Sequence, residues 1–286
     1  MTSDLAQRIR IAYPQFSKNQ KKIATVVLND YEKIAGMTAA RLARVVGVSE
    51  STVVRFAAML GFSRYAGLRM AIEDLLRKKL TLNQRIDATK ERIYRRDIIE
   101  NVMKADINRL KTTMEELDKK AFSSSVDAII NAKNVYVIGA RGSEALAKML
   151  QYNLSLIFDN VKFIIPNSTA EVFEQIYSIG SDDTLIAFCY PRYSSKVVNA
   201  VKYAKNNGAS VILFTDTDAA PPAEYATNLL LSQVDFASFM DSLVAPLCIV
   251  NALVIEITNR REGEIRRRFD NLERVWDEYG VYTKGK

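Results

Sequence analysis

Two short loops in the second half of the chain combine an arginine with serine hydroxyls. The first is Gly-Ala-Arg-Gly-Ser over 139–143, and the second is Pro-Arg-Tyr-Ser-Ser over 191–195. Guanidinium and hydroxyl groups donate hydrogen bonds to phosphate or carboxylate oxygens, and the helix predicted after each loop offers free N–H groups at its start. The pattern predicts an anion-binding site, whose expected residues are Arg141, Gly142, Ser143, Arg192, Tyr193, Ser194 and Ser195.

A serine in front of a helix is also a common N-cap, so either loop by itself favours capping over a ligand. The two loops considered together favour the anion site, because each carries an arginine. That interpretation requires a fold that brings the two loops side by side.

Five short apolar, β-branched runs predict the strands that would do so. The runs are 135–140, 161–165, 184–190, 210–216 and 227–232. Helical patterns separate them at 144–158, 170–179 and 195–207. Buried strands that alternate with helices predict an α/β fold, a five-stranded parallel αβα sandwich of the flavodoxin-like type. In a 2-1-3-4-5 strand order, the loops after the first and third strands flank the switch point, where ligands bind.

A second constellation lies near the start of the chain, over residues 39–58. Ala43 is small enough for two helices to touch, and Gly47 tolerates the positive φ of a tight turn. Thr38 and Ser49 stand where the two helices would be capped. Apolar residues occupy the positions that would be buried: Leu42, Val46, Val48, Val53 and Phe56. This spacing predicts an all-α helix-turn-helix domain whose second helix enters the major groove of DNA.

The exposed face of that second helix is expected to contact double-stranded operator DNA. The residues predicted on it are Ser49, Glu50, Ser51, Thr52 and Arg55. Arg55 has the fork geometry that suits guanine or a phosphate, and the hydroxyls suit bases or backbone. The predicted phosphate contacts beside the helix are Arg64, Tyr65, Lys18, Lys21 and Lys22.

The distribution of charge agrees with this assignment. Residues 1–80 contain 14 Lys or Arg against 6 Asp or Glu, a net charge of +8, whereas the whole chain carries +7. A basic module joined to a near-neutral body is typical of nucleic-acid binding, although a solvated basic face would have the same composition.

The chain is long enough for two domains. We predict a DNA-binding domain at 1–80, a helical linker at 81–120, an effector-binding domain at 121–260, and a C-terminal helix or tail at 261–286. The helical pattern over 84–132 and the apolar helix near 239–258 carry more apolar surface than one sandwich needs. We therefore expect a homo-oligomer, a dimer or tetramer, that presents paired helices to the half-sites of a pseudo-palindrome.

The absence of histidine argues against an enzyme, because histidine is the commonest catalytic acid or base. Glu171 and Glu174 are the acids expected nearest the switch point, and capping or solvating their helix explains them more simply. A sensor is favoured, and a sugar-phosphate isomerase is the alternative. The sequence also lacks a metal-ligand cluster, a Gly-Lys-Ser/Thr phosphate loop and a full Gly-x-Gly-x-x-Gly motif, so no cofactor is predicted.

Cys189 and Cys248 lie far apart in sequence and are expected to be buried thiols of a cytoplasmic protein. The first residues lack the features of a signal peptide, and no apolar run reaches the ~18 residues of a membrane helix. No membrane partner is predicted.

Three segments together resemble the RpiR family of bacterial transcriptional regulators. They are VSESTVVRFAAMLGFSRYAGL at 48–68, VIGARGSEALA at 137–147, and FCYPRYSSKVVNAVKYAKNNGASVILFTD at 188–216. The resemblance covers nearly the whole chain. It implies an N-terminal helix-turn-helix joined to a sugar isomerase (SIS) domain that binds phosphorylated sugars and controls carbohydrate-catabolism genes.

The resemblance also places Ser143 at the serine of the family's first sugar-phosphate loop and Ser194 at the hydroxyl of the second. The chain departs from the family pattern at Arg141, where many SIS domains have glycine, and at Cys189 and Pro191, where serines are common. Two hydroxyl donors are replaced and two arginines are present. The departure suggests an effector with an additional acidic group, such as a phosphorylated sugar acid.

Overall fold

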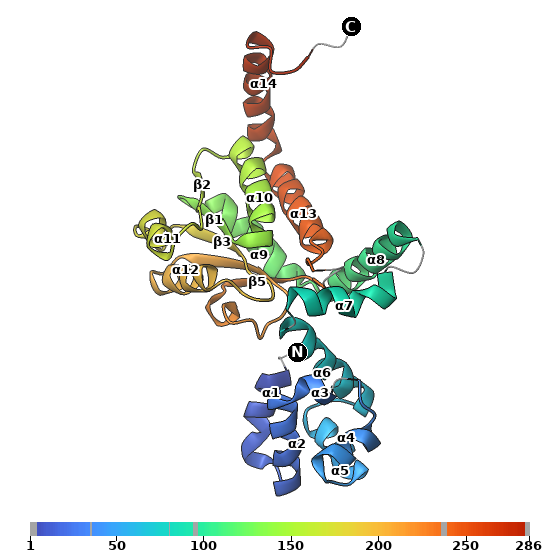
Figure 1. Ribbon diagram of the computed structural model, residues 1–286. Helices are drawn as coiled ribbons and strands as arrows, with labels where there is room; N and C mark the ends of the chain where they lie inside the picture. The colour runs from blue at the N-terminus through green and yellow to red at the C-terminus, as the bar shows by residue number, and fades with distance from the viewer. Residues whose placement is uncertain (1–4, 35, 80, 94–96, 236–238, 284–286) are drawn as a thin grey trace. The chain divides into compact units, whose positions relative to one another are not determined.

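The computed structural model describes residues 5–34, 36–79, 81–93, 97–235 and 239–283, and its elements are labelled in Figure 1. The chain divides into two compact units. The first contains residues 1–98 with 217–219 and 236–239, and the second contains 99–216, 220–235 and 240–286. Residues 81–120, which we expected to form a linker, are divided between the two units.

The first unit is entirely helical in its described residues. Its helices are α1 (Leu5–Ala12), α2 (Lys18–Asn29), α3 (Tyr31–Ile34), α4 (Ala39–Val46), α5 (Glu50–Met59), α6 (Tyr65–Lys79) and α7 (Leu82–Ile93). Helix α2 ends at Asn29, and Asp30 separates it from α3.

The caps predicted for α4 and α5 are present. The Thr38 side chain accepts a hydrogen bond from the Arg41 N–H, and the Ser49 side chain accepts one from the Thr52 N–H. Gly47 ends α4 with φ 73°, a left-handed conformation that favours glycine. Ile23, Leu42 and Phe56 are fully buried between the helices. The all-α helix-turn-helix prediction for this region is confirmed.

The second unit contains a parallel sheet in the order β2-β1-β3-β4-β5, as expected. Its strands are β1 (Val135–Gly139), β2 (Val161–Phe163), β3 (Thr184–Phe188), β4 (Ser210–Thr215) and β5 (Asn228–Leu231). The register pairs Gly139 at the end of β1 with Phe188 at the end of β3. The loops that follow these two strands therefore begin side by side.

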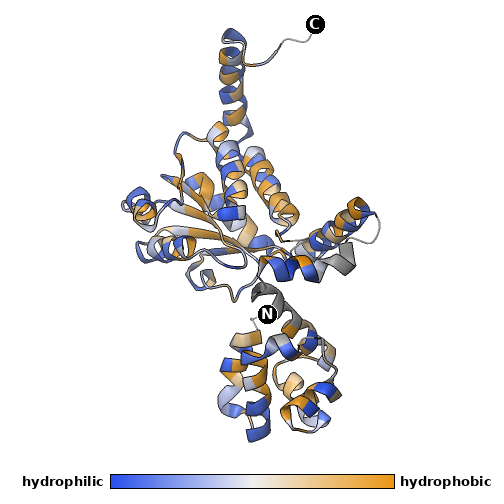
Figure 2. Ribbon diagram, in the orientation of Figure 1, coloured by the Kyte–Doolittle hydropathy of each residue, from blue (hydrophilic) through white to orange (hydrophobic). Residues whose placement is uncertain are grey.

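The remaining helices are α8 (Ile98–Glu116), α9 (Lys119–Asn131), α10 (Glu144–Ile157), α11 (Thr169–Ile176), α12 (Ser195–Asn206), α13 (Val244–Arg260) and α14 (Glu262–Glu278). Five of them, α9 to α13, cover the two faces of the sheet. Side chains of α9, α10 and α13 pack against one face, and those of α11 and α12 against the other. Figure 2 shows how apolar the strands and α13 are. This three-layer arrangement confirms the predicted αβα sandwich.

The helix expected over 239–258 begins later, at Val244, and continues to Arg260. Residues 236–238 lie outside the described part of the chain. Pro246 falls in the first turn of α13, where no backbone N–H is needed for a helical hydrogen bond. Five apolar residues of α13 and this proline are buried in the unit's own core, whereas Ile255 on the same helix is 60% exposed.

The end of β1 is in unusually close contact with α10. A Cβ atom added to Gly139 would lie 2.5 Å from the Ser143 carbonyl oxygen and 2.9 Å from the Ala147 Cβ. Both distances are shorter than side chains tolerate, so glycine is required here for a steric reason. The helix that follows β1 can therefore start directly at the edge of the sheet.

Replacing Gly139 by alanine should destabilise the α/β unit by about 1–3 kcal/mol, because a methyl group is forced into a packed backbone contact. Urea unfolding followed by circular dichroism measures the effect. Gly180→Ala is the matched control, since an added Cβ there meets nothing within 4 Å. Equal stability of the two variants would contradict the steric explanation.

Candidate DNA-binding and effector sites

The recognition helix α5 presents a polar face at its start. Glu50, Ser51 and Arg55 are exposed, and Thr52 is half-buried. The Ser49 Oγ lies 3.0 Å from the Ser51 Oγ and 2.8 Å from the Thr52 Oγ1. These three hydroxyls therefore form one connected group at the N-terminus of the helix, where phosphate or base edges would be recognised.

One exposed residue of this helix escaped the sequence analysis. Val54 is an apolar residue with 45% of its surface exposed, three residues after Ser51 on α5. Apolar side chains at such a position contact thymine methyl groups in the major groove. The sequence did indicate this residue, because Val54 is apolar and is not among the residues predicted to be buried, such as Val53 and Phe56.

The basic residues of α2 lie close to the recognition helix. The Phe16 ring, directly before α2, packs 5.1 Å from the Phe56 ring of α5, and the Gln20 amide donates to the Met59 sulfur. Lys18 and Lys22 are exposed on this helix, whereas Lys21 is half-buried and lies over the Tyr13 ring. Their position beside α5 suits contacts to the DNA backbone.

Arg64 and Tyr65 differ in their surroundings. Arg64 is exposed just before α6. The Tyr65 hydroxyl donates a 2.9 Å hydrogen bond to the Met37 carbonyl, so its proton is already used within the fold. Tyr65 therefore positions the start of α6, and Arg64 is the better candidate for a phosphate contact.

The candidate effector site lies at the carboxyl ends of β1 and β3. Arg141, Gly142 and Ser143 form a single 3-10 turn between β1 and α10. Arg192 is exposed and Ser194 is half-buried in the loop between β3 and α12. Ser195 is exposed as the first residue of α12.

The two arginines share an uncommon backbone conformation. Arg141 has φ 57° and Arg192 has φ 67°, and among the described residues Asp97 is the third non-glycine with a positive φ. Residues with a side chain pay about 1–3 kcal/mol for such a conformation, and strained positions of this kind cluster at ligand sites. The parallel strain in the two loops supports a functional reason for arginine at both positions.

The serines of the two loops are not explained by capping. Ser143 and Ser194 occupy the N-cap positions of α10 and α12, and the side chain of neither makes a capping hydrogen bond. Their hydroxyls remain able to donate to a ligand. The alternative interpretation, in which these serines serve only as caps, therefore loses its main support.

An acid that the sequence analysis missed borders the second loop. Asp216 follows β4, and its carboxylate accepts a 2.8 Å hydrogen bond from the Tyr193 hydroxyl. The sequence predicted that the strand would extend to Asp216, whereas β4 ends at Thr215. As expected, Glu171 and Glu174 serve their own helix: Glu171 belongs to the cap of α11, where it pairs with Ser168, and Glu174 is exposed.

The two cysteines differ in environment. Cys189 is buried at the start of the second loop, whereas Cys248 is exposed on α13, so our expectation of two buried thiols was wrong for Cys248. Burial raises the pKa of Cys189 to about 12, against a smaller lowering by a backbone hydrogen bond from Ser194. The Cys189 thiol stays neutral at physiological pH and adds no negative charge beside the candidate site.

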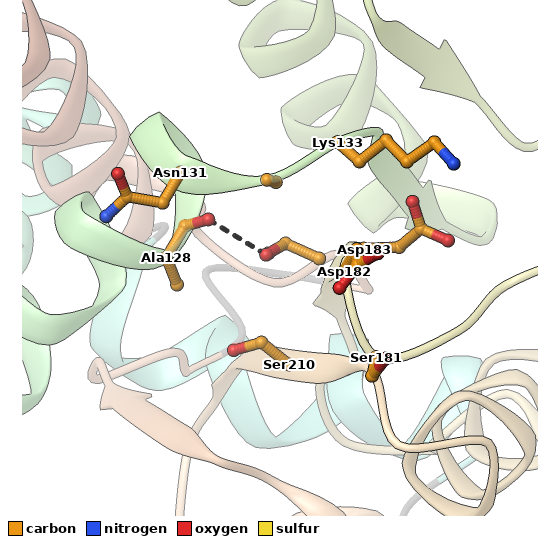
Figure 3. Close-up of a pocket in the computed structure, with 9 residues that line it drawn as sticks. Ala128, Asn131, Lys133, Ser181, Asp182, Asp183 and Ser210 are labelled. Carbon is orange, nitrogen blue, oxygen red and sulfur yellow. Dashed lines mark hydrogen bonds between the residues drawn. The ribbon is translucent and has the colours of Figure 1, made fainter.

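A pocket of about 500 Å³ lies elsewhere, near the start of β3 and β4, and is lined by α9 and by residues 181–184 (Figure 3). Its polar groups have structural partners. The Thr184 hydroxyl donates to the Ala128 carbonyl, and the Asp183 carboxylate accepts from Asn134 and from the Gly180 N–H. These bonds attach α9 to the sheet, and we assign no ligand to this pocket.

No described helix combines the length and apolar character needed to cross a bilayer. Within the described ranges, no group of His, Cys, Asp and Glu has the arrangement of a metal site.

Comparison with known proteins supports the two-part organisation. Residues 3–79 match the model of the helix-turn-helix domain of the rpiR family, and residues 128–256 match the SIS domain. The transcriptional regulator HexR of Pseudomonas aeruginosa is 25% identical over 273 residues, which is 90% of each chain. An uncharacterised helix-turn-helix regulator of Haemophilus influenzae is 24% identical over 235 residues, 81% of this chain and 80% of that one.

Solved structures share the fold. The Vibrio vulnificus NanR protein, complexed with ManNAc-6P, has a TM-score of 0.60 at 22% identity and covers 98% of this chain and 100% of its own. The sugar isomerase domain of an RpiR transcription factor from Sphaerobacter thermophilus has a TM-score of 0.60 at 23% identity, covering 63% and 99%. The chain joins a DNA-reading helical domain to a SIS domain, and it belongs to the RpiR family of transcriptional regulators.

Replacing Arg55 by alanine should weaken specific DNA binding by about 1–3 kcal/mol, because a base or phosphate contact of the recognition helix is lost. Lys22→Ala should weaken binding to all sequences alike and reduce the salt slope by about one. Fluorescence anisotropy with specific and scrambled duplexes measures both. An Arg55 variant that binds its operator like the wild type would remove this residue from the interface.

Replacing Arg141 by glycine should raise the unfolding free energy by about 0.5–1 kcal/mol, because glycine adopts a positive φ without strain. Arg141→Ala is the matched control and should leave stability nearly unchanged, since alanine keeps the strained backbone. Thermal unfolding distinguishes the two. A stabilising alanine variant would show that the side chain, and not φ, is the source of any strain.

Proposed function

We propose that the α/β domain of this regulator binds a phosphorylated sugar or sugar acid between the loops 139–143 and 191–195. The observation that carries the proposal is the pairing of Arg141 and Arg192, both with positive φ, at the adjacent ends of β1 and β3. The helix N-termini behind them add partial positive charge, and Ser143 and Ser194 add hydroxyl donors.

Two arginines favour an effector with two anionic groups. A phosphate held by one loop leaves the guanidinium of the other loop free for a carboxylate. NanR has been solved with a phosphorylated sugar, so a related domain accommodates that class of ligand. The half-buried Tyr193, held by Asp216, would line the same crevice and contact the sugar hydroxyls.

We infer that the effector regulates and is not converted. Relatives of this chain are named transcriptional regulators. An aldose–ketose isomerase needs a general base beside the substrate carbon. Glu171 is committed to a helix cap, and Asp216 is bonded to Tyr193. The genes controlled would be those of carbohydrate catabolism.

Self-association would couple effector binding to DNA binding. Helix α8 carries a stripe of exposed apolar residues at helical spacing: Ile99, Met103, Ile107 and Met114. Their exposed fractions reach 73% at Ile99 and 70% at Met114, which is unusual for a monomer surface. We infer a homo-oligomer that contacts through this stripe and pairs two α5 helices on a pseudo-palindromic operator. Effector binding shifts the oligomer only as far as it favours one arrangement.

The test is a titration of the full chain on the DNA beside its own gene, followed by fluorescence anisotropy. Sugar phosphates and phosphorylated sugar acids are compared. We expect one sugar acid to shift DNA binding, and Arg141→Ala and Arg192→Ala each to weaken that effector by roughly 10- to 100-fold, the loss of a charge-assisted hydrogen bond.

Lys120→Ala, at an exposed basic residue of α9, is the control and should leave the titration unchanged. A neutral sugar that binds tightly without dependence on Arg141 would overturn the proposed effector class. Turnover of any panel member, with no specific DNA binding, would favour the isomerase alternative.

A further inference from the structure

Helix α14 leaves most of its surface uncovered. It extends from the α/β body beyond α13 (Figure 1), and Ile265 is its buried residue. Arg268 attaches its first half to the end of α10, donating to the Leu156 and Ser155 carbonyls and pairing with Asp159 at 2.7 Å. The second half, from Phe269 onward, makes no such attachment among the contacts of the described residues.

The apolar residues of this helix repeat with coiled-coil spacing. Ile265, Phe269, Leu272, Trp276 and Tyr279 follow one another at intervals of four, three, four and three. That alternation places them on one stripe, the seam by which two helices pack. Phe269 is 38% exposed and Tyr279 is 75% exposed, whereas Leu272 and Trp276 are half-buried. The Tyr282 ring of the same chain lies edge-on to Trp276 at 5.6 Å, so the seam is only partly covered.

We propose that α14 pairs in antiparallel orientation with α14 of a second copy of this chain. The charges along the helix indicate that its partner is a second copy of the same helix. The first half of the helix contains Glu262 and Glu264 against three arginines at 266–268, so it is net positive. The second half contains four acids, Asp270, Glu273, Asp277 and Glu278, against Arg274, so it is net negative. An antiparallel second copy sets the net positive half of one helix beside the net negative half of the other, so the helix is complementary to itself.

The flanking positions agree with this orientation. When Ile265 packs against Trp276 of the second copy, Arg266 lies beside Glu273, and symmetry repeats the pair. The Arg266 side chain is 75% exposed, and its contact with Glu262 lies on the same helix. Glu273 is exposed and has no ion pair among the described residues.

A parallel pair would instead depend on Arg268 facing Glu273. Arg268 is held against α10 by two backbone carbonyls and by Asp159, so it is not available for that role. The α14 seam is also distinct from the α8 stripe. It would join two effector-controlled assemblies end to end, a function that does not depend on the identity of the effector.

Trp276 makes the proposal directly testable, because it is the one tryptophan of the chain and lies on the seam. The full chain is studied by sedimentation velocity and tryptophan emission over a series of concentrations. We expect the sedimentation coefficient to rise and the emission to shift to shorter wavelengths together, as pairing buries the indole. Leu272→Asp should abolish both changes, whereas Tyr177→Asp, at an exposed aromatic residue of the α/β body, should abolish neither.

Charge exchange tests the orientation with variants at exposed positions, which should fold normally. Arg266→Glu and Glu273→Arg should each weaken self-association by about fivefold, from two symmetric surface pairs, and the double variant should restore it. Met103→Asp distinguishes association through α8 from association through α14. It should alter assembly without changing how the tryptophan emission depends on concentration. Tryptophan emission that does not vary with protein concentration would overturn the α14 pair. If the double variant does not restore self-association, the antiparallel orientation is wrong.

Discussion

The close approach of α10 to the carboxyl end of β1 is the constraint on which the effector half of this protein depends. At Gly139 the backbone of the strand and the first turn of the helix are so near that no Cβ would fit. The chain must therefore turn within residues 141–143, which puts the free N–H groups of α10 at the edge of the sheet. Since β3 ends in register with β1, the second loop is brought to the same edge.

Conformational strain accompanies this arrangement. A glycine at position 141 or 192 would adopt the observed backbone at no steric cost, yet both positions carry arginine. Strained residues with long charged side chains are commonly found where recognition takes precedence over stability. The Tyr193–Asp216 hydrogen bond attaches the second loop to the end of β4, and the buried Cys189 thiol adds no charge there.

The two halves of the molecule meet different physical requirements. The DNA-reading unit concentrates the positive charge, because phosphate attraction dominates nucleic-acid affinity and falls with salt. The α/β unit is near neutral overall and carries one arginine in each of the two loops. Coupling between them requires an element with two arrangements that the effector distinguishes, and an oligomer interface is the common form of such an element.

The sequence by itself determined the elements and their order. Periodicity, caps and the glycine at the turn were sufficient for α4, α5 and the parallel sheet, because Thr38, Gly47 and Ser49 act through local backbone geometry. The two arginine loops were also evident, since residue type and position after a strand are local properties. Only the tertiary structure showed which side chains already have a hydrogen-bond partner within the fold and which are exposed. It showed that Tyr65 is bonded to Met37, that Asp216 reaches Tyr193, and that Cys248 is exposed. Those facts depend on contacts between residues distant in the chain, which no local pattern encodes.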